Sequence, residues 1–228
     1  MKTDRAVPQR SVPLSGSLDQ PIVAIVDDDE AVREALSELV LSAGLSPLAF
    51  SSTPELLDAD VLDRPGCLIL DVRMPGASGL DLQHQLARSG NLKPIIFITG
   101  HGDIPMTVQA MKAGAVDFLT KPVRDQTLLD AIHTAIARDA EWRAMAEAGR
   151  NAAVLYETLT PRERQVLRLV VTGSLSKQIA FELGISEVTV KLHRSSMMRK
   201  MKAASLPRLL NTWQTLPGPI RDGPPDAR

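Results

Sequence analysis

The chain of 228 residues contains one cysteine, Cys67, and aromatic residues make up only 3% of it. A single cysteine excludes an intramolecular disulfide framework and fits a reducing compartment. Because Cys67 lies in the apolar run CLIL, we expect a buried core thiol. The four histidines, His84, His101, His133 and His193, are scattered without the spacing of metal ligands.

Long hydrophobic runs are also absent. No apolar stretch approaches the ~20 residues that a helix needs to cross a bilayer. Residues 1–20 carry charges and prolines but no apolar core, so they do not resemble a secretory signal. We therefore expect a cytoplasmic protein. Residues 1–20 and 216–228 are rich in proline, glycine and charge and are predicted to be disordered.

The net charge of -1 hides an uneven distribution of charge along the chain. Between Pro21 and Ala135, 16 acidic residues stand against 8 basic ones. Between Thr160 and Thr212, 10 basic residues stand against 3 acidic ones. An acidic half joined to a basic half indicates two domains, of which the second has a polyanionic partner.

Short apolar runs alternate with amphipathic segments from Pro21 onward. The runs at 22–26, 67–70, 94–99 and 115–119, with a weaker one at 47–50, predict buried parallel strands. Helical patterns lie at 30–43, 54–61, 79–89 and 104–113, and another begins at 124. This alternation predicts an α/β domain with a doubly wound five-stranded parallel sheet, whose function lies at the carboxyl ends of the strands.

The second half of the chain shows only helical patterns. Thr160-Pro161-Arg162-Glu163 combines a hydroxyl N-cap, proline at the first position and an acid at the third, which predicts a helix start. Ser176 and Ser186 are expected to cap the next two helices, with Gly184 in the turn between them. The predicted organisation is a domain at 21–138, a helical linker at 139–156 and a small all-α domain at 157–215.

Polar residues follow the predicted strands at the edge where parallel strands end together. They are Asp27 and Asp28 after the first strand, Asp71 after the third, Thr99 after the fourth, and Thr120 and Lys121 after the fifth. Clustered carboxylates raise one another's pKa unless a cation is near, and Mg²⁺ prefers such oxygen ligands. Phosphoryl transfer uses these groups together: a carboxylate, a hydroxyl group, an ammonium group and Mg²⁺. Each residue alone is more often structural, so the prediction depends on their combination.

The motifs VDDDEAVR, LILDVRMPGASGLDL, PIIFITGHGD and MKAGAVDFLTKP resemble the receiver domain of two-component response regulators. The resemblance implies a flavodoxin-like receiver in which Asp71 accepts a phosphoryl group from a histidine kinase. It also implies Mg²⁺ or Mn²⁺ bound by Asp27, Asp28, Asp71 and the backbone carbonyl of Arg73. Thr99, Lys121 and the aromatic Phe118 are the implied phosphoryl-contacting and switch residues. Val123 departs from the phenylalanine common after Lys-Pro in such proteins.

An enzyme of the haloacid-dehalogenase type remains an alternative, since Asp27 and Asp29 form a DxD motif after an apolar strand. Such phosphatases also use Mg²⁺. Their motif continues with threonine or valine where this chain has Ala31, and they need a further acidic pair at a strand end, whereas Asp125 and Asp130 fall in a helical pattern. We favour a simpler division in which Asp27 and Asp28 bind the cation and Asp29 and Glu30 cap the following helix.

The stretch from Leu159 to Leu210 resembles a LuxR-type helix-turn-helix. Together with the receiver it resembles the NarL/FixJ family, and in particular the branch of FixJ, NodW, TodT and StyR. Helix 187–201 places Val190, His193, Met197 and Met201 on a core-facing stripe. On the other face we expect Lys191, Leu192 and Ser195 to read base edges, and Arg194, Arg199, Thr189 and Lys177 to contact phosphates.

These features predict a phosphorylation-controlled, DNA-binding transcriptional regulator that is not a turnover enzyme. The implied partners are a sensor histidine kinase, promoter DNA and RNA polymerase, with homodimer formation through the region 104–119 on phosphorylation. A phosphorylation-independent DNA binder, in which the receiver serves only as an interaction module, is the second hypothesis. Nothing in the sequence identifies the signal, the kinase or the promoter.

Overall fold

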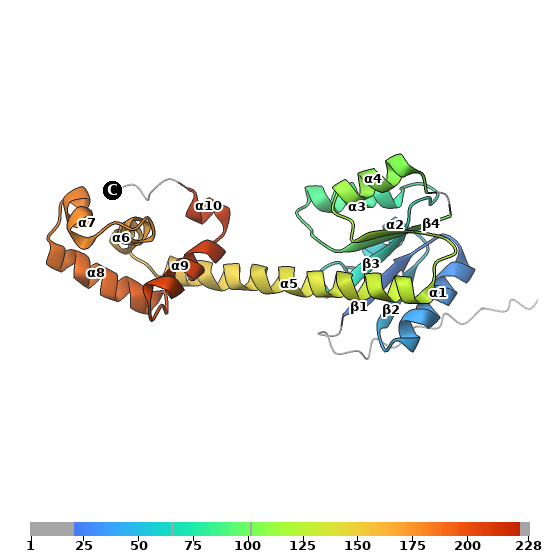
Figure 1. Ribbon diagram of the computed structural model, residues 1–228, viewed down its shortest axis with the longest axis horizontal. Helices are drawn as coiled ribbons and strands as arrows, with labels where there is room; N and C mark the ends of the chain where they lie inside the picture. Colours follow the sequence, from blue (N-terminus) through green and yellow to red (C-terminus); the bar gives the residue numbers. More distant parts are fainter. Residues whose placement is uncertain (1–20, 65, 101, 224–228) are drawn as a thin grey trace, which may run out of the picture. The chain divides into compact units, whose positions relative to one another are not determined.

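The computed structural model describes residues 21–64, 66–100 and 102–223 (Figure 1). The N-terminal segment 1–20, His101 and residues 224–228 lie outside this range, as does Pro65. The chain divides into two compact units, Met1–Ala140 and Glu141–Arg228, which are described separately below.

The first unit contains a five-stranded sheet in which every pair of neighbouring strands is parallel. Its strands are β1 (Ile22–Val26), β2 (Ser46–Phe50), β3 (Gly66–Asp71), β4 (Ile95–Thr99) and β5 (Asp117–Thr120), in the spatial order β2-β1-β3-β4-β5. All five predicted strands are present, and the predicted fold class is confirmed. The strand order reverses direction at β1, which in doubly wound folds marks the place of the functional crevice.

Each inner strand is buried on both faces, which explains its unbroken apolar sequence. Along β1, Ile22, Ala24 and Val26 belong to the core on one side of the sheet. Val23 and Ile25 belong to the core on the other side. The same alternation continues in β3 and β4, as the period of two in a strand requires.

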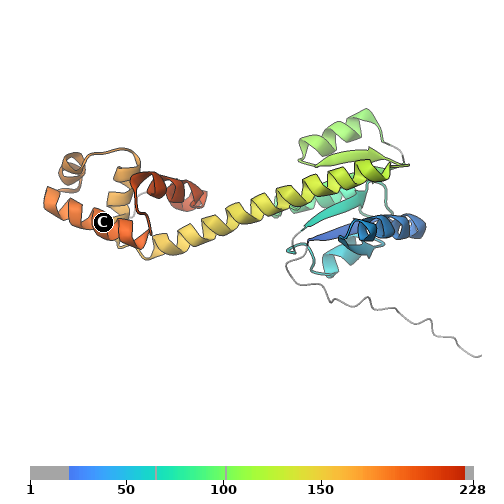
Figure 2. The same cartoon turned by 60° about the horizontal axis from the view of Figure 1, so that its bottom comes forward.

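Helices cover both faces of the sheet, as the views in Figures 1 and 2 show. The helices are α1 (Glu30–Ser42), α2 (Thr53–Asp58), α3 (Gly79–Arg88), α4 (Ile104–Lys112) and α5 (Asp125–Glu157). Residues of α2, α3 and α4 join the core on one face, and residues of α1 and α5 join the core on the other. In the part of the chain that the structure describes, no helix is long and apolar enough to cross a membrane.

Cys67 lies in β3 and is completely buried, as the sequence predicts. Burial raises the pKa of its thiol to about 12, since the charged thiolate is disfavoured away from water. The thiol is therefore a core group without nucleophilic character at neutral pH.

The start of β3 is joined to α5 by a buried hydrogen bond. The Gly66 N–H donates to Oδ2 of Asp139 at 2.9 Å, and Asp139 is only 5% exposed. Gly66 has φ of 133°, and a Cβ at this position would lie 1.8 Å from the carbonyl oxygen of Ile22. Only glycine fits at this position. The hydrogen bond between Gly66 and Asp139 joins α5 to the sheet at Asp139.

The second unit consists of the end of α5 and a group of short helices around one core. These helices are α6 (Pro161–Val171), α7 (Ser176–Leu183), α8 (Glu187–Lys200), α9 (Leu206–Thr215) and α10 (Gly218–Arg221). The start of α6 is a capping box, as predicted. The Glu163 N–H donates to the Thr160 hydroxyl, and the Thr160 N–H donates to the Glu163 carboxylate.

The predicted caps of α7 and α8 have different outcomes. Ser186 caps α8, because its hydroxyl oxygen accepts from the Thr189 N–H at 3.0 Å. The prediction for Ser176 is wrong by one residue. Helix α7 begins at Ser176 itself, and the residue before it, Leu175, is the N-cap. The free N–H of Leu175 is satisfied by the side chain of Gln178, whose Oε1 accepts at 2.7 Å. Gly184 ends α7 in the left-handed conformation, at φ 64°.

The disorder predicted for 216–228 is wrong for the residues that the structure describes. Leu216 is 2% exposed in the core of the second unit, and α10 follows it. The guanidinium of Arg168 donates to the carbonyl oxygens of Ile220, Arg221 and Gly223. These contacts satisfy carbonyls at the end of α10, which otherwise have no partner within the helix.

Glu163 joins α6 to α8 within the second unit. It is 4% exposed, and its Oε2 accepts from Nζ of Lys200 at 2.6 Å. Burial alone would raise the pKa of Glu163. Hydrogen bonds from Lys200, Ser196 and the Thr160 N–H outweigh burial and lower the pKa to about 2.

The lowered pKa of Glu163 gives a test of its ion pair with Lys200. Because the pKa is lower in the folded state, the stabilisation is complete above the unfolded value of 4.5 and is lost as the pH falls towards 2. Glu163→Gln should lower the free energy of unfolding at neutral pH by at most about 3 kcal/mol, and the loss should vanish in acid. Urea unfolding followed by tryptophan fluorescence measures it, since Trp142 and Trp213 both lie in the second unit. Glu182→Gln, exposed on α7, is the control. An unchanged pH dependence in Glu163→Gln would contradict the prediction.

Candidate functional site

Three carboxylates meet where β1 and β3 end. Asp27 directly follows β1, and Asp71 is the last residue of β3, which pairs with β1 in parallel. Asp27 and Asp71 are buried, at 2% and 8% exposure, whereas Asp28 is exposed. Oxygen atoms of the three side chains lie within 4.8 Å of one another. The sequence therefore predicted correctly that these acids lie together.

Lys121 reaches into this cluster from the segment after β5. Its Nζ lies 2.5 Å from Oδ2 of Asp27 and 2.9 Å from Oδ2 of Asp71. Its backbone N–H donates to the carbonyl oxygen of Thr99 at 2.8 Å, which fixes the segment against the end of β4. The lysine ammonium is thus placed by the sheet between two buried carboxylates.

The electrostatics of the cluster reflect burial and this ion pair. Burial raises the pKa of Asp27 above its usual value, although the hydrogen bonds from Lys121 and the Asp29 N–H act in the opposite direction. Burial alone would lower the pKa of Lys121, but its hydrogen bonds to Asp27 and Asp71 outweigh this and raise it. Lys121 is therefore charged at neutral pH.

The cluster surrounds a hollow of about 310 Å³. Its lining contains every receiver residue predicted to hold the cation or the phosphoryl group, with the exception of Phe118. The lining residues are Asp27, Asp28, Asp29, Asp71, Arg73, Thr99, Gly100 and Lys121. Thr99 is 1% exposed. Carboxylate oxygens in an open hollow fit a hard cation such as Mg²⁺, which also keeps some water ligands.

Asp29 plays a different role from its two neighbours. Its Oδ1 accepts from the N–H groups of Ala31 and Val32, at 2.9 and 3.4 Å, and so caps α1. The predicted division between cation ligands and a capping residue is confirmed for Asp29. The general acid that a phosphatase would need at this position is therefore engaged in helix capping, and Asp125 and Asp130 lie in α5.

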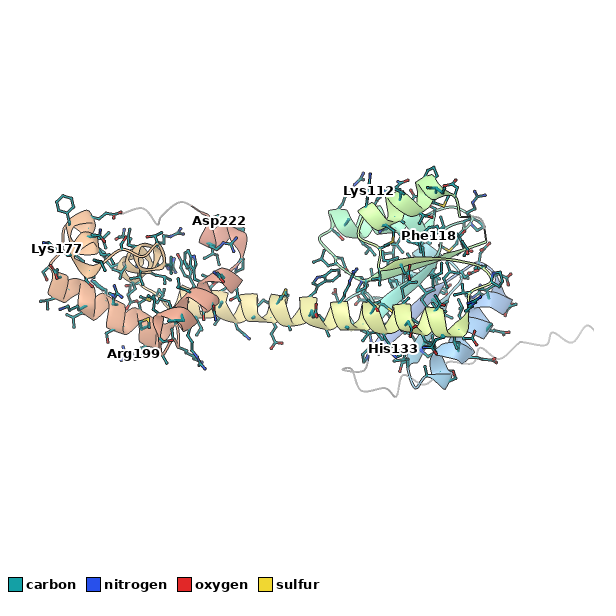
Figure 3. All side chains as sticks on the ribbon, viewed as in Figure 1. Lys112, Phe118, His133, Lys177, Arg199 and Asp222 are labelled. Atoms are coloured by element: carbon teal, nitrogen blue, oxygen red, sulfur yellow. The ribbon has the colours of Figure 1, made fainter. Side chains whose placement is uncertain are left out.

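The face of α8 that points away from the core carries most of the residues predicted to contact DNA. Val190, Met197 and Met201 are buried, and His193 is half-buried, as expected for the core-facing stripe. The exposed residues of the predicted contact set are Lys191, Leu192, Ser195 and Arg199, with Lys177 on α7. Figure 3 labels Arg199 and Lys177. Arg194 and Thr189 are half-buried.

Two family models match the chain. Residues 23–133 match the response regulator receiver domain, and residues 157–212 match the bacterial regulatory proteins of the luxR family. The chain belongs to the response regulators with a luxR-family DNA-binding domain. It is 53% identical to nodulation protein W of Bradyrhizobium diazoefficiens and 52% identical to response regulator protein TodT of Pseudomonas putida, over 86% of each chain in both cases.

Solved structures of relatives extend this similarity to the fold. The response regulator StyR has a TM-score of 0.74 at 48% identity, covering 86% of this chain and 98% of StyR. Full-length FixJ from B. japonicum has a TM-score of 0.53 at 37% identity, covering 86% of this chain and 96% of that one. The transcriptional regulatory protein FixJ of Azorhizobium caulinodans is 47% identical over 82% of this chain and 89% of its own.

In this response regulator, the hollow is connected to α4 through Gly102. A Cβ at Gly102 would lie 2.9 Å from Cε1 of Phe118 and 3.4 Å from Cγ2 of Thr99. The segment before α4 therefore packs closely against the side chains of Phe118, Thr120 and Thr99. The Phe118 ring, labelled in Figure 3, is half-buried, and its centroid lies 6.0 Å from that of Phe97. Sequence alone singled out Thr99 and Phe118 but missed the close approach of Gly102.

Val188 was not among the predicted contact residues, and it is 68% exposed at the second position of α8. The sequence contains a sign of this exposure, because the apolar Val188 does not share the helical spacing of the core residues Val190, Met197 and Met201. An apolar residue on the polar face of an amphipathic helix is where a contact with another molecule can be sought.

The position of Lys121 predicts how the hollow binds metal. Its ammonium lies against two of the three carboxylates, so it competes with a divalent cation for their charge. Lys121→Ala should lower the dissociation constant for Mg²⁺ by roughly tenfold, as expected for removing one unit charge from a partly solvated site. Titration calorimetry at constant ionic strength measures the change. Lys112→Ala, exposed on α4, should leave the constant unaltered. Equal or weaker binding in Lys121→Ala would contradict this role.

Proposed function

We propose that the protein is a transcriptional regulator whose DNA binding is controlled by phosphorylation of Asp71. The observation that supports this most directly is the placement of the Asp71 carboxylate. It lies on the wall of an open hollow, with an ammonium at 2.9 Å and two further carboxylates in reach of a shared cation. An oxygen of Asp71 attacks phosphorus in line, and the bond to the donor nitrogen breaks with its electron pair remaining on nitrogen.

The other residues of the hollow hold the phosphoryl group. Asp27, Asp28, Asp71 and the carbonyl of Arg73 would hold Mg²⁺ or Mn²⁺, which would neutralise charge on the phosphoryl oxygens. Lys121 moves its ammonium from the Asp71 carboxylate to the new phosphoryl oxygens. The hydroxyl of Thr99 donates to a phosphoryl oxygen from the end of β4. These roles follow from the family and agree with the lining of the hollow.

The change at Asp71 reaches α4 through the contact between Thr99, Gly102 and Phe118. When the Thr99 side chain moves towards the phosphoryl group, the ring of Phe118 turns into the space that it leaves. Both side chains lie close to Gly102. Helix α4 presents Ile104, Val108 and Met111 to solvent, at 81%, 44% and 42% exposure. An exposed apolar face is suited to association. We propose that this face forms the homodimer after phosphorylation, so that two recognition helices bind a two-fold related site.

The donor of the phosphoryl group is a sensor histidine kinase. A second cavity, of about 910 Å³, lies between α1 and the start of α5 and shares Lys121 with the hollow. Its lining includes Val32, Leu36, Leu39 and Val123. An apolar cavity that adjoins the acceptor gives a partner helix a place to bind while its histidine reaches Asp71.

The second unit binds promoter DNA through α8, with RNA polymerase as the downstream partner and the cytoplasm as the place of action. Lys191, Leu192 and Ser195 read base edges, and Arg194, Arg199 and Lys177 contact phosphates. Thr189 is the weakest member of the predicted phosphate set, because its hydroxyl already lies 2.8 Å from that of Ser186. We assign residues 21–138 to the receiver, 139–156 to the linker and 157–215 to the DNA-binding domain.

Labelling with acetyl phosphate tests the acceptor. The wild-type protein should incorporate phosphate in the presence of Mg²⁺, and Asp71→Asn should incorporate none, because an amide cannot act as the nucleophile. Asp58→Asn, exposed at the end of α2, should be labelled like the wild type. Beryllofluoride should strengthen DNA binding by the wild type and leave Asp71→Asn unaffected. Persistent labelling of Asp71→Asn would exclude the assignment. Equal DNA affinity with and without beryllofluoride would favour the phosphorylation-independent binder instead.

Two substitutions in α8 separate base reading from phosphate contact. Lys191→Ala should weaken binding to a selected site by about 1–3 kcal/mol and change unrelated sequences much less. Arg199→Ala should weaken binding to all sequences about equally and reduce the slope of affinity against salt concentration. Fluorescence anisotropy over a series of salt concentrations measures both. A uniform loss in Lys191→Ala would show that it contacts a phosphate.

A further inference from the structure

We propose that Val188 is a specificity-determining residue that contacts the 5-methyl group of a thymine in the major groove. This inference depends on the proposed binding of DNA through α8 and adds a residue outside the predicted contact set. It identifies the chemical group that is recognised, which is an apolar methyl group on a base edge rather than a hydrogen-bonding atom.

Val188 contributes little to the core of its own domain. It is 68% exposed, whereas Val190, two residues later, is fully buried. The core of the second unit contains Val190, Met197 and Met201 from this helix and its C-cap, but not Val188. Valine is also a poorer helix former than alanine, because its branched side chain loses rotamer freedom in a helix. Neither packing nor helix propensity therefore accounts for a valine here.

The neighbours of Val188 restrict the kind of partner. Leu192 lies one turn further along the same face and is 66% exposed. Lys191 is exposed beside them, and Arg199 and Lys202 follow towards the end of the helix. An apolar protein surface would bring Val188 and Leu192 together with these unpaired cations. A DNA groove satisfies both kinds of side chain, because phosphates flank a floor of base edges.

Val188 lies near the N-terminus of α8, which is the part of a recognition helix that reaches the bases. A recognition helix enters the major groove with its N-terminal residues, and Val188 follows Glu187, the first residue of α8. The start of the helix is fixed by the Ser186 cap, so the side chain of Val188 is presented on a rigid turn. Among the major-groove edges, thymine presents a methyl group with which an apolar side chain makes contact.

Replacing thymine with deoxyuridine tests this contact, since it removes the methyl group and keeps every hydrogen-bonding atom. Full-length protein with beryllofluoride is first used to select binding sites from a pool of random duplexes. Each thymine of the selected site is then replaced singly by deoxyuridine, and affinity is measured by anisotropy at one salt concentration. One replacement in each half-site should weaken wild-type binding about three- to fivefold, as expected for one buried methyl group.

Val188→Ser identifies the side chain responsible. This variant should bind the thymine duplex about as weakly as the wild type binds the deoxyuridine duplex, and it should no longer distinguish the two at that position. Val154→Ser is the matched control, because Val154 is 62% exposed on α5 and outside α8. It should retain the wild-type response to deoxyuridine. Replacement of other thymines should affect Val188→Ser and the wild type equally.

The outcomes separate this inference from the proposed function. Enrichment of a specific site with no response to deoxyuridine at any thymine would overturn the role of Val188 and leave DNA recognition intact. If Val188→Ser loses as much affinity as the wild type on deoxyuridine replacement at every position, the role of Val188 is also overturned and DNA recognition stays intact. Failure to enrich any sequence would contradict both the proposed function and this inference.

Discussion

Repulsion among three carboxylates at one edge of the sheet is the constraint around which the receiver is arranged. Oxygens of Asp27, Asp28 and Asp71 lie within 4.8 Å of one another, and two of these side chains are buried. A nearby cation favours the ionised form of such carboxylates. Lys121 supplies one, and Lys121 is placed by β5 and by its backbone contact with the end of β4. The order of the strands therefore determines the chemistry, because it brings four strand ends to a single hollow.

The same repulsion gives the site two states. While Lys121 pairs with Asp71, the acceptor is held by an internal ion. In the proposed function, a phosphoryl group on Asp71 would add negative charge and new oxygens, and the lysine and the Thr99 hydroxyl would gain different partners. Side chains of Thr99 and Phe118 both lie close to Gly102, just before α4. The proposed signal would therefore pass by packing from the hollow to α4, whose residues Ile104, Val108 and Met111 are exposed.

Local pattern was sufficient for the parts of the fold that depend on neighbours in sequence. The buried strands appear as apolar runs, and the carboxyl ends of parallel strands must share an edge, so the positions of Asp27, Asp71 and Lys121 followed from pattern and topology together. The caps at Thr160 and Ser186 have local signatures as well. Ser176 is not a cap because α7 already begins at Ser176, with Leu175 as the N-cap, and composition does not reveal this shift of one residue.

Long-range polar contacts could not be predicted in this way. Arg168 binds carbonyls that lie 52 to 55 residues later in the chain, and this is why the segment after Leu216 is folded although its composition resembles that of a disordered tail. The contact between Gly66 and Asp139 spans 73 residues and gives no signal in either segment. Both contacts are side chains donating to or accepting from backbone groups that secondary structure leaves unsatisfied.

In helix α8, the residues that folding requires are separate from those of the proposed DNA contact. Its core side is complete with Val190 and Met197, so the stability of the domain does not require apolar residues elsewhere on the helix. Val188 and Leu192 nevertheless lie on the outer side among basic residues. A solvent-exposed basic helix that served only electrostatic attraction would gain nothing from them, because phosphates offer no apolar surface. Their presence is explained by a partner that combines negative charge with methyl groups, which is the composition of the major groove at thymine.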